Sequence, residues 1–152
     1  MKYILLIISF LISALTFGQK KYEPAWYQME RDGEYLKMAS HLLYQVQSDS
    51  TRNEHADYLH IARSYGYLND YEKAIFYLNK SMDGRSEKDD KLFWWYYKGT
   101  LAFFKRDKEE LEEYLEKLEA NYTPYYENNF RTLKSLYENF EKGYREASSW
   151  KG

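Results

Sequence analysis

Three histidines, His41, His55 and His60, are the side chains best suited to acid–base or metal chemistry in this sequence, which contains no cysteine. His60 and Ser64 are four residues apart, so on one helix they could touch as a base and a nucleophile. No glycine-rich turn that would present the serine, and no oxyanion feature, accompanies them. The pair therefore indicates a surface hydrogen bond at most, and we expect the protein not to be an enzyme.

Metal and nucleotide chemistry lack the residue patterns that they need. His55 and His60 are five residues apart, a spacing that turns their side chains away from each other on a helix. The sequence has no His-Glu-x-x-His arrangement, no loop of alternating acids and no glycine-rich phosphate loop. Carboxylate pairs such as Glu109–Glu110 alternate with lysines, as on solvated helix surfaces. We expect no bound metal and no cofactor.

The composition fits one folded domain with a solvated surface. Of the 152 residues, 44% are hydrophobic and 30% are charged, a balance that can fill a core. Only two prolines and seven glycines interrupt the chain, which favours long helices. With 24 acidic and 22 basic residues, the protein has no basic excess or polybasic patch to bind phosphates, so we expect no nucleic-acid partner.

The first residues differ in kind from the rest of the chain. Lys2 precedes an almost wholly apolar run from Ile4 to Leu15, and Thr16 and Gly18 are at the positions that a signal peptidase reads. We predict a signal peptide over residues 1–18, with cleavage after Gly18. The alternative is a membrane anchor, but this run is shorter than the about 20 apolar residues that a span needs. The mature protein is then expected in a bacterial periplasm or outside the cell, with no stable membrane span.

After this leader, apolar residues recur at helical spacing with brief interruptions, which predicts an all-helical domain over residues 19–152. Thr51 with Glu54 and Asp107 with Glu110 have the spacing of capping boxes, and Ser86 is a further candidate cap. The predicted helices cover, approximately, residues 24–29, 34–47, 51–68, 71–82, 86–104, 107–119, 123–140 and 144–149.

These helices form pairs that recur at a period typical of a solenoid. Residues 55–82 resemble a tetratricopeptide repeat, with matches at Tyr58, Ile61, Ala62, Tyr65, Asn69, Tyr71, Ala74, Leu78 and Ser81. Ser81 replaces the usual alanine, and no proline follows. The next pair fits the same frame through Trp95, Gly99, Ala102, Leu111, Leu115 and Leu118. The resemblance implies a short right-handed solenoid of antiparallel helix pairs, about three repeats plus terminal caps.

The resemblance also implies a binding surface, because the first helix of each tetratricopeptide pair lines an inner concave face. It places seven residues there: Tyr27, Leu59, Arg63, Tyr67, Tyr96, Thr100 and Phe103. Tyrosine and arginine are favoured at recognition surfaces. We therefore predict an exported interaction module that holds a peptide or protein partner of the cell envelope. The alternative is that Tyr137 and Phe140 fold over this groove and fill it.

A run of five aromatic residues, Phe93-Trp94-Trp95-Tyr96-Tyr97, supports a second hypothesis. Consecutive side chains point all around a helix, so some of these rings must be buried between helices while others reach its surface. Exposed rings that cluster would mark a binding patch. The alternative function is therefore a small-ligand or glycan binder, and the competing structural interpretation is that the whole run packs between helix pairs.

Overall fold

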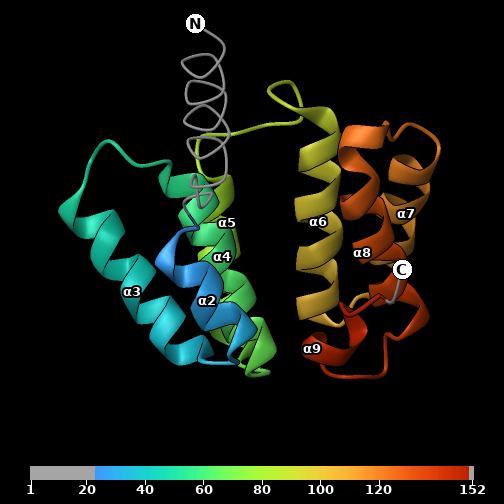
Figure 1. Ribbon diagram of the computed structural model, residues 1–152. Coiled ribbons are helices and arrows are strands. Elements are labelled where there is room, and N and C mark those ends of the chain that lie inside the picture. Colours follow the sequence, from blue (N-terminus) through green and yellow to red (C-terminus); the bar gives the residue numbers. More distant parts are fainter. Residues whose placement is uncertain (1–22, 151–152) are drawn as a thin grey trace, which may run out of the picture.

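The computed structural model describes residues 23–150, and all of the regular structure in this range is helical (Figure 1). The predicted signal peptide over residues 1–18 lies outside the described residues. None of the described helices has the length and apolar character needed to cross a membrane. The helices are α2 (Ala25–Arg31), α3 (Tyr35–Ser48), α4 (Glu54–Tyr67), α5 (Tyr71–Met82), α6 (Lys91–Lys105), α7 (Lys108–Glu119), the 3-10 turn η1 (Pro124–Tyr126), α8 (Glu127–Glu138) and α9 (Tyr144–Ala147).

Each helix packs against its neighbour in the chain, and two further contacts, α6 with α8 and α4 with α9, join helices that are not neighbours. Within the first half, α4 packs against both α3 and α5, and α2 contacts α3. Within the second half, α8 packs against both α6 and α7 (Figure 1). The short α9 contacts α8 and also α4, so the C-terminal end of the described chain returns to the first half. This return is what closes the candidate site described below.

The start of α4 differs from the predicted capping box. Asn53, not Thr51, is the N-cap, and its side chain accepts a hydrogen bond from the Ala56 amide at 3.3 Å. Thr51 instead donates its backbone N–H and its hydroxyl to Asp49. The Thr51 cap was therefore wrong, because an asparagine closer to the first helical turn satisfies its amides.

The start of α6 differs in the same way. Ser86 does not cap this helix, because its amide and hydroxyl donate to Asp89 within the preceding loop. The N-cap is Asp90, which accepts from the Phe93 amide at 3.0 Å. The predicted cap of α7 is confirmed, since the Asp107 side chain accepts from the Glu110 amide at 2.9 Å.

Small residues lie at the contacts between helices. Ala62 on α4 and Ala74 on α5 are fully buried. A Cβ atom on Gly99 of α6 would lie 2.7 Å from Leu133 Cδ1 of α8. Side chains of ordinary size at these three positions would push the helices apart, since protein interiors are close-packed. Small residues therefore mediate helix contact at positions where the sequence matches the tetratricopeptide pattern.

The turn between α4 and α5 holds the start of α9 in place. Asn69 has φ 58°, a left-handed conformation that asparagine tolerates better than most residues. Its Oδ1 accepts from the Tyr144 amide at 3.3 Å, and the Tyr71 hydroxyl accepts from the same amide at 3.1 Å. Tyr144 is fully buried, with its ring close to those of Phe103 and Phe104. These contacts fix the Tyr144 side chain beside α4.

Candidate functional site

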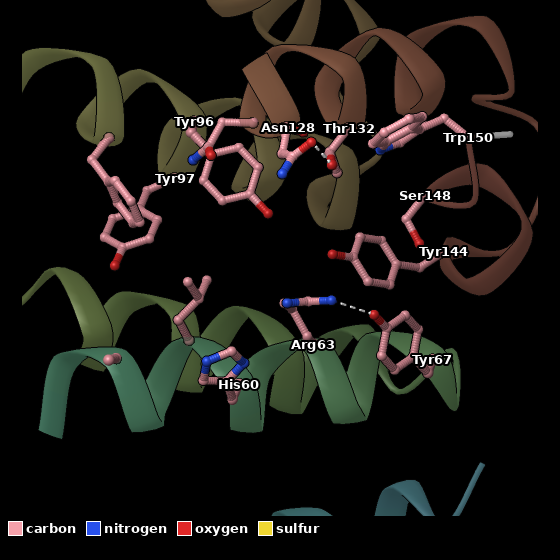
Figure 2. A pocket seen from close by; sticks show the side chains of 14 residues that line it. His60, Arg63, Tyr67, Tyr96, Tyr97, Asn128, Thr132, Tyr144, Ser148 and Trp150 are labelled. Carbon is pink, nitrogen blue, oxygen red and sulfur yellow. Dashed lines mark hydrogen bonds between the residues drawn. The ribbon is translucent and has the colours of Figure 1, made fainter. Parts of the chain in front are cut away.

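A cleft of about 630 Å³ lies between α4 and a second wall built from α6, α8 and the C-terminal segment (Figure 2). Its volume is in the range of ligand pockets in proteins, roughly 300–1,000 Å³. The residues that line it are Ala56, Leu59, His60, Arg63, Tyr67, Phe93, Tyr96, Tyr97, Asn128, Asn129, Thr132, Tyr144, Ser148 and Trp150.

Four of the seven residues predicted for a binding surface line this cleft: Leu59, Arg63, Tyr67 and Tyr96. The first three come from one face of α4, where their spacing of four residues aligns them. Tyr27 lies elsewhere, on α2, with 43% of its surface exposed. It packs edge-on against Trp26 and is not part of the cleft lining.

Thr100 and Phe103 are corrections to the predicted surface, because both are fully buried. The Thr100 hydroxyl donates to the Tyr96 carbonyl at 2.9 Å, and the Phe103 ring packs edge-on against Phe140. Helix α8 packs on α6, so the C-terminal half of α6 faces other helices and not a groove. Sequence periodicity could not distinguish a concave face from a face that another helix covers.

Tyr137 and Phe140 do not fill the cleft. The Tyr137 hydroxyl donates to Glu112 on α7, and Phe140 lies beneath the Arg106 guanidinium. The opposite wall is instead made by residues that sequence reasoning did not select: Asn128, Asn129, Thr132, Tyr144, Ser148 and Trp150. No local pattern marks these residues, since they reach the cleft only through the packing of α8 and α9.

The aromatic run on α6 is divided between core and cleft. Trp95 is buried, and its indole N–H donates to Glu87 at 3.1 Å. Phe93, Tyr96 and Tyr97 contribute to the cleft lining. The run therefore combines the two alternatives, because most of its rings pack between helices and three of them also form a wall of the site.

Arg63 belongs to a closed set of polar contacts at one end of the cleft. Its Nη2 donates to Glu30 Oε1 at 2.8 Å and to the Tyr67 hydroxyl at 2.7 Å. The Tyr67 hydroxyl in turn donates to Glu30 Oε1 at 2.9 Å. Burial raises the pKa of Tyr67 to about 12, which keeps this hydroxyl protonated near neutral pH. The Nε and Nη1 groups of Arg63 have no hydrogen-bond partner among residues 23–150, so they remain available as donors.

Tyr144 contributes a second available donor. Its hydroxyl is buried and has no hydrogen-bond partner in the described part of the chain. Burial raises the pKa of Tyr144 well above its usual value, so the hydroxyl stays protonated. Figure 2 shows the hydroxyl groups of Tyr96 and Tyr144 pointing into the space beside the Arg63 guanidinium. A buried donor without an acceptor costs about 1–3 kcal/mol, which a ligand oxygen would offset.

His60 is a neutral group at the edge of this site. Burial, and secondarily the nearby charge of Arg63, lowers the pKa of His60 to about 4. Its ring lies against Trp26 at a centroid distance of 4.0 Å, and its Nδ1 is buried without a partner among the described residues. Ser64 donates its hydroxyl to the His60 backbone carbonyl at 2.9 Å, not to the imidazole. This geometry does not activate Ser64 as a nucleophile.

The cleft offers many hydrogen-bonding groups and little net charge. Arg63 is the only charged residue in its described lining, and the other polar groups are tyrosine, serine and threonine hydroxyls, amides and the neutral imidazole. Residues 23–150 hold no cluster of His, Cys, Asp and Glu that could bind a metal ion. The site can therefore donate to oxygen atoms of a ligand and pack aromatic rings against its apolar parts.

Compared with protein-family models, with curated proteins and with solved structures, the chain matches none of them.

Proposed function

We propose that this protein is a non-catalytic interaction module that binds a short peptide segment of a partner protein in the cleft. In this proposal α4–α5 and α6–α7 are two tetratricopeptide-like repeats, and the remaining helices cap them. One observation carries the proposal: the Nε and Nη1 groups of Arg63 and the hydroxyl of Tyr144, which have no partner among the described residues, converge between aromatic walls.

A peptide has the chemistry that this lining matches. Its carbonyl groups can accept hydrogen bonds from Arg63 and Tyr144, and the side-chain amides of Asn128 and Asn129 can both donate to and accept from a peptide backbone. Aromatic walls suit peptide side chains, since rings combine a large contact area with few rotatable bonds. The volume limits the bound segment to a few residues.

The location of the partner follows from the leader sequence and not from the cleft. If residues 1–18 direct export, the mature protein meets its partner in the periplasm or outside the cell. An envelope or secreted protein is then the source of the peptide. Amino-terminal sequencing of the protein purified from the periplasmic fraction would test this, and an intact Met1 would contradict it.

The peptide proposal can be tested by selection from a random peptide display library, followed by calorimetry with variants that block the cleft. Asn128→Trp should weaken binding of a selected peptide by about tenfold or more, because an indole there would occupy the cleft. Glu138→Trp is the matched control, an exposed residue of the same helix outside the lining. Equal binding by both variants would place the peptide elsewhere and contradict the proposal.

A second candidate function is the binding of a small neutral glycan. It is favoured by one observation: the rings of Phe93, Tyr96 and Trp150 share the cleft with uncharged hydroxyl and amide groups. A glycan panel scored by ligand-induced shifts in melting temperature would test this, with Asn128→Trp as the blocked control. Shifts that survive the Asn128→Trp substitution, or no shift across the panel, would contradict it.

A further inference from the structure

Glu30 forms an ion pair with Arg63 of the cleft, although Glu30 itself is not part of the cleft lining. It is presented by α2, and its Oε1 accepts hydrogen bonds from both Arg63 and Tyr67. The Glu30 side chain is only 18% exposed, so solvent screens this ion pair weakly. Helix α2 has no buried residue of its own, and its Trp26 ring also lies against the His60 ring of α4 in a tilted arrangement.

The positive charge of Arg63, the only charged residue in the described cleft lining, is balanced by Glu30. Arg63 carries one positive charge, and the Glu30 carboxylate lies 2.8 Å from its Nη2. Tyr67, Tyr96 and Tyr144 are the neighbouring polar groups, and Tyr67 and Tyr144 stay protonated because they are buried. No other lysine or arginine is found in the described lining. A ligand in the cleft therefore faces the N–H groups of an Arg63 guanidinium whose positive charge is already neutralised by Glu30.

This arrangement distinguishes between two kinds of ligand acceptor. A carboxylate or phosphate at Arg63 Nε and Nη1 would bring a second negative charge close to Glu30, with no second cation to offset it. A carbonyl or hydroxyl oxygen would accept from the same donors, and from the Tyr144 hydroxyl, without adding charge. The Arg63–Glu30 pair thus orients hydrogen-bond donors toward a ligand but has no net charge that would attract an anion.

We infer that the cleft selects an uncharged hydrogen-bond acceptor, and that Glu30 is the residue that sets this specificity by excluding anions from Arg63. The inference rests on the proposed function only in taking the cleft to be the binding site. It makes Glu30 a positioning and specificity residue, since it acts through Arg63 and contacts no ligand itself. Glu30→Gln removes the charge but keeps a side-chain oxygen that Arg63 and Tyr67 can donate to.

The first experiment needs no knowledge of the natural ligand. The side-chain Nε–H resonance of Arg63 is followed by NMR while acetate, and separately acetamide, is titrated into the protein. We expect acetate to bind Glu30→Gln about tenfold or more tightly than it binds the wild type. Acetamide should bind the two proteins alike. Glu34→Gln is the matched control, because Glu34 pairs with the exposed Lys37 and not with Arg63.

The second experiment uses peptides selected on the wild-type protein, each synthesised with either Gln or Glu at its central position. The wild type and Glu34→Gln should prefer the Gln form by about tenfold, and Glu30→Gln should lose this preference. Calorimetry measures both affinities. The Gln-to-Glu ratio is a readout that a merely structural role of Glu30 would not move, since a loosened fold would weaken both forms together.

The outcomes separate this inference from the proposed function. Preference of the wild type for acetate or for the Glu peptides would overturn the inference, even if Glu30→Gln failed to fold. An unchanged ratio in folded Glu30→Gln would also overturn it. If selected peptides bind equally well to Asn128→Trp, the peptide proposal fails, while the acetate titration still decides the charge selectivity of Arg63.

Discussion

The two walls of the cleft are built in different ways. The α4 wall presents Leu59, Arg63 and Tyr67 from a single helix, and its geometry follows from a helical repeat of side chains along one face. The opposite wall presents Asn128 and Tyr144 from separate elements, held by contacts between residues far apart in sequence. The comparison teaches that a local pattern can place one side of a binding site, whereas the partner side depends on tertiary packing.

The largest expected effect comes from removing the anchor of the opposite wall. Tyr144→Ala should lower the free energy of unfolding by about 4 kcal/mol, because it empties the site of a large and fully buried ring. Urea denaturation measures the loss. Tyr144→Phe should instead raise stability, by up to about 1–3 kcal/mol, because it removes a buried hydroxyl that has no partner among the described residues. A loss below about 1 kcal/mol in Tyr144→Ala would show that this wall is anchored elsewhere.

A second test addresses the α4 wall through pH. The pKa of His60 is lowered from 6.5 to about 4, so between these values the unfolded chain binds a proton that the folded protein does not. The His60 contribution to stability is therefore complete above pH 6.5 and is lost as pH falls toward 4. His60→Phe keeps the ring on Trp26 and should be more stable than the wild type by about 2–3 kcal/mol at pH 4.

Two measurements check this second prediction. Histidine imidazole signals followed by NMR should show His60 titrating far below the usual range for histidine. Denaturation of both proteins at a series of pH values should give a stability difference that grows as the pH falls. A constant difference between pH 7 and pH 4 would mean that His60 is accessible to protons in the folded protein.

The third test concerns the junction where the two walls meet. A Cβ atom on Gly66 of α4 would lie 2.7 Å from Phe104 Cε1 and 2.8 Å from Tyr144 Cδ1. Both rings are buried and cannot easily move, so Gly66→Ala should cost about 2 kcal/mol despite the better helix propensity of alanine. Gly99→Ala should cost less in the same denaturation assay, because its closest contact is the flexible end of Leu133.

The smallest expected effect tests the long-range docking of α9. Asn69→Gly relieves the left-handed backbone but removes one of the two acceptors of the Tyr144 amide, leaving only the Tyr71 hydroxyl, so it should cost about 1 kcal/mol or less. Hydrogen exchange should show faster exchange of the Tyr144 amide, while the amides of α4 stay protected. Uniformly faster exchange in both walls would indicate that they unfold as one unit.

The same contrast explains how much the sequence could predict. Helical periodicity located the ends of the helices of residues 23–150 to within five residues, and Ala62, Ala74 and Gly99, which match the repeat pattern, lie at helix contacts. The caps at Thr51 and Ser86 were wrong because Asn53 and Asp90 lie nearer to the helix starts. In each case two capping residues were present, and only the backbone path decided between them.

For the candidate site, the prediction worked where one helix face was sufficient. Arg63 and Tyr67 line the cleft, whereas Thr100 and Phe103 are buried under neighbouring elements. Asn128 and Trp150 could not be selected, since no spacing in the sequence relates them to α4. Whether a partner uses the cleft remains a prediction for the binding experiments.

The contact between Asn69 and Tyr144 has a consequence for how the cleft forms in time. It joins residues 75 positions apart, whereas the pairing of α4 with α5 closes a loop of only a few residues. Closing long loops is slow relative to forming local hairpins, because more chain entropy must be lost first. We therefore expect the cleft to assemble in the last stage of folding, after the helical hairpins. The cleft of a nascent chain would be complete only once residues 144–150 have been synthesised.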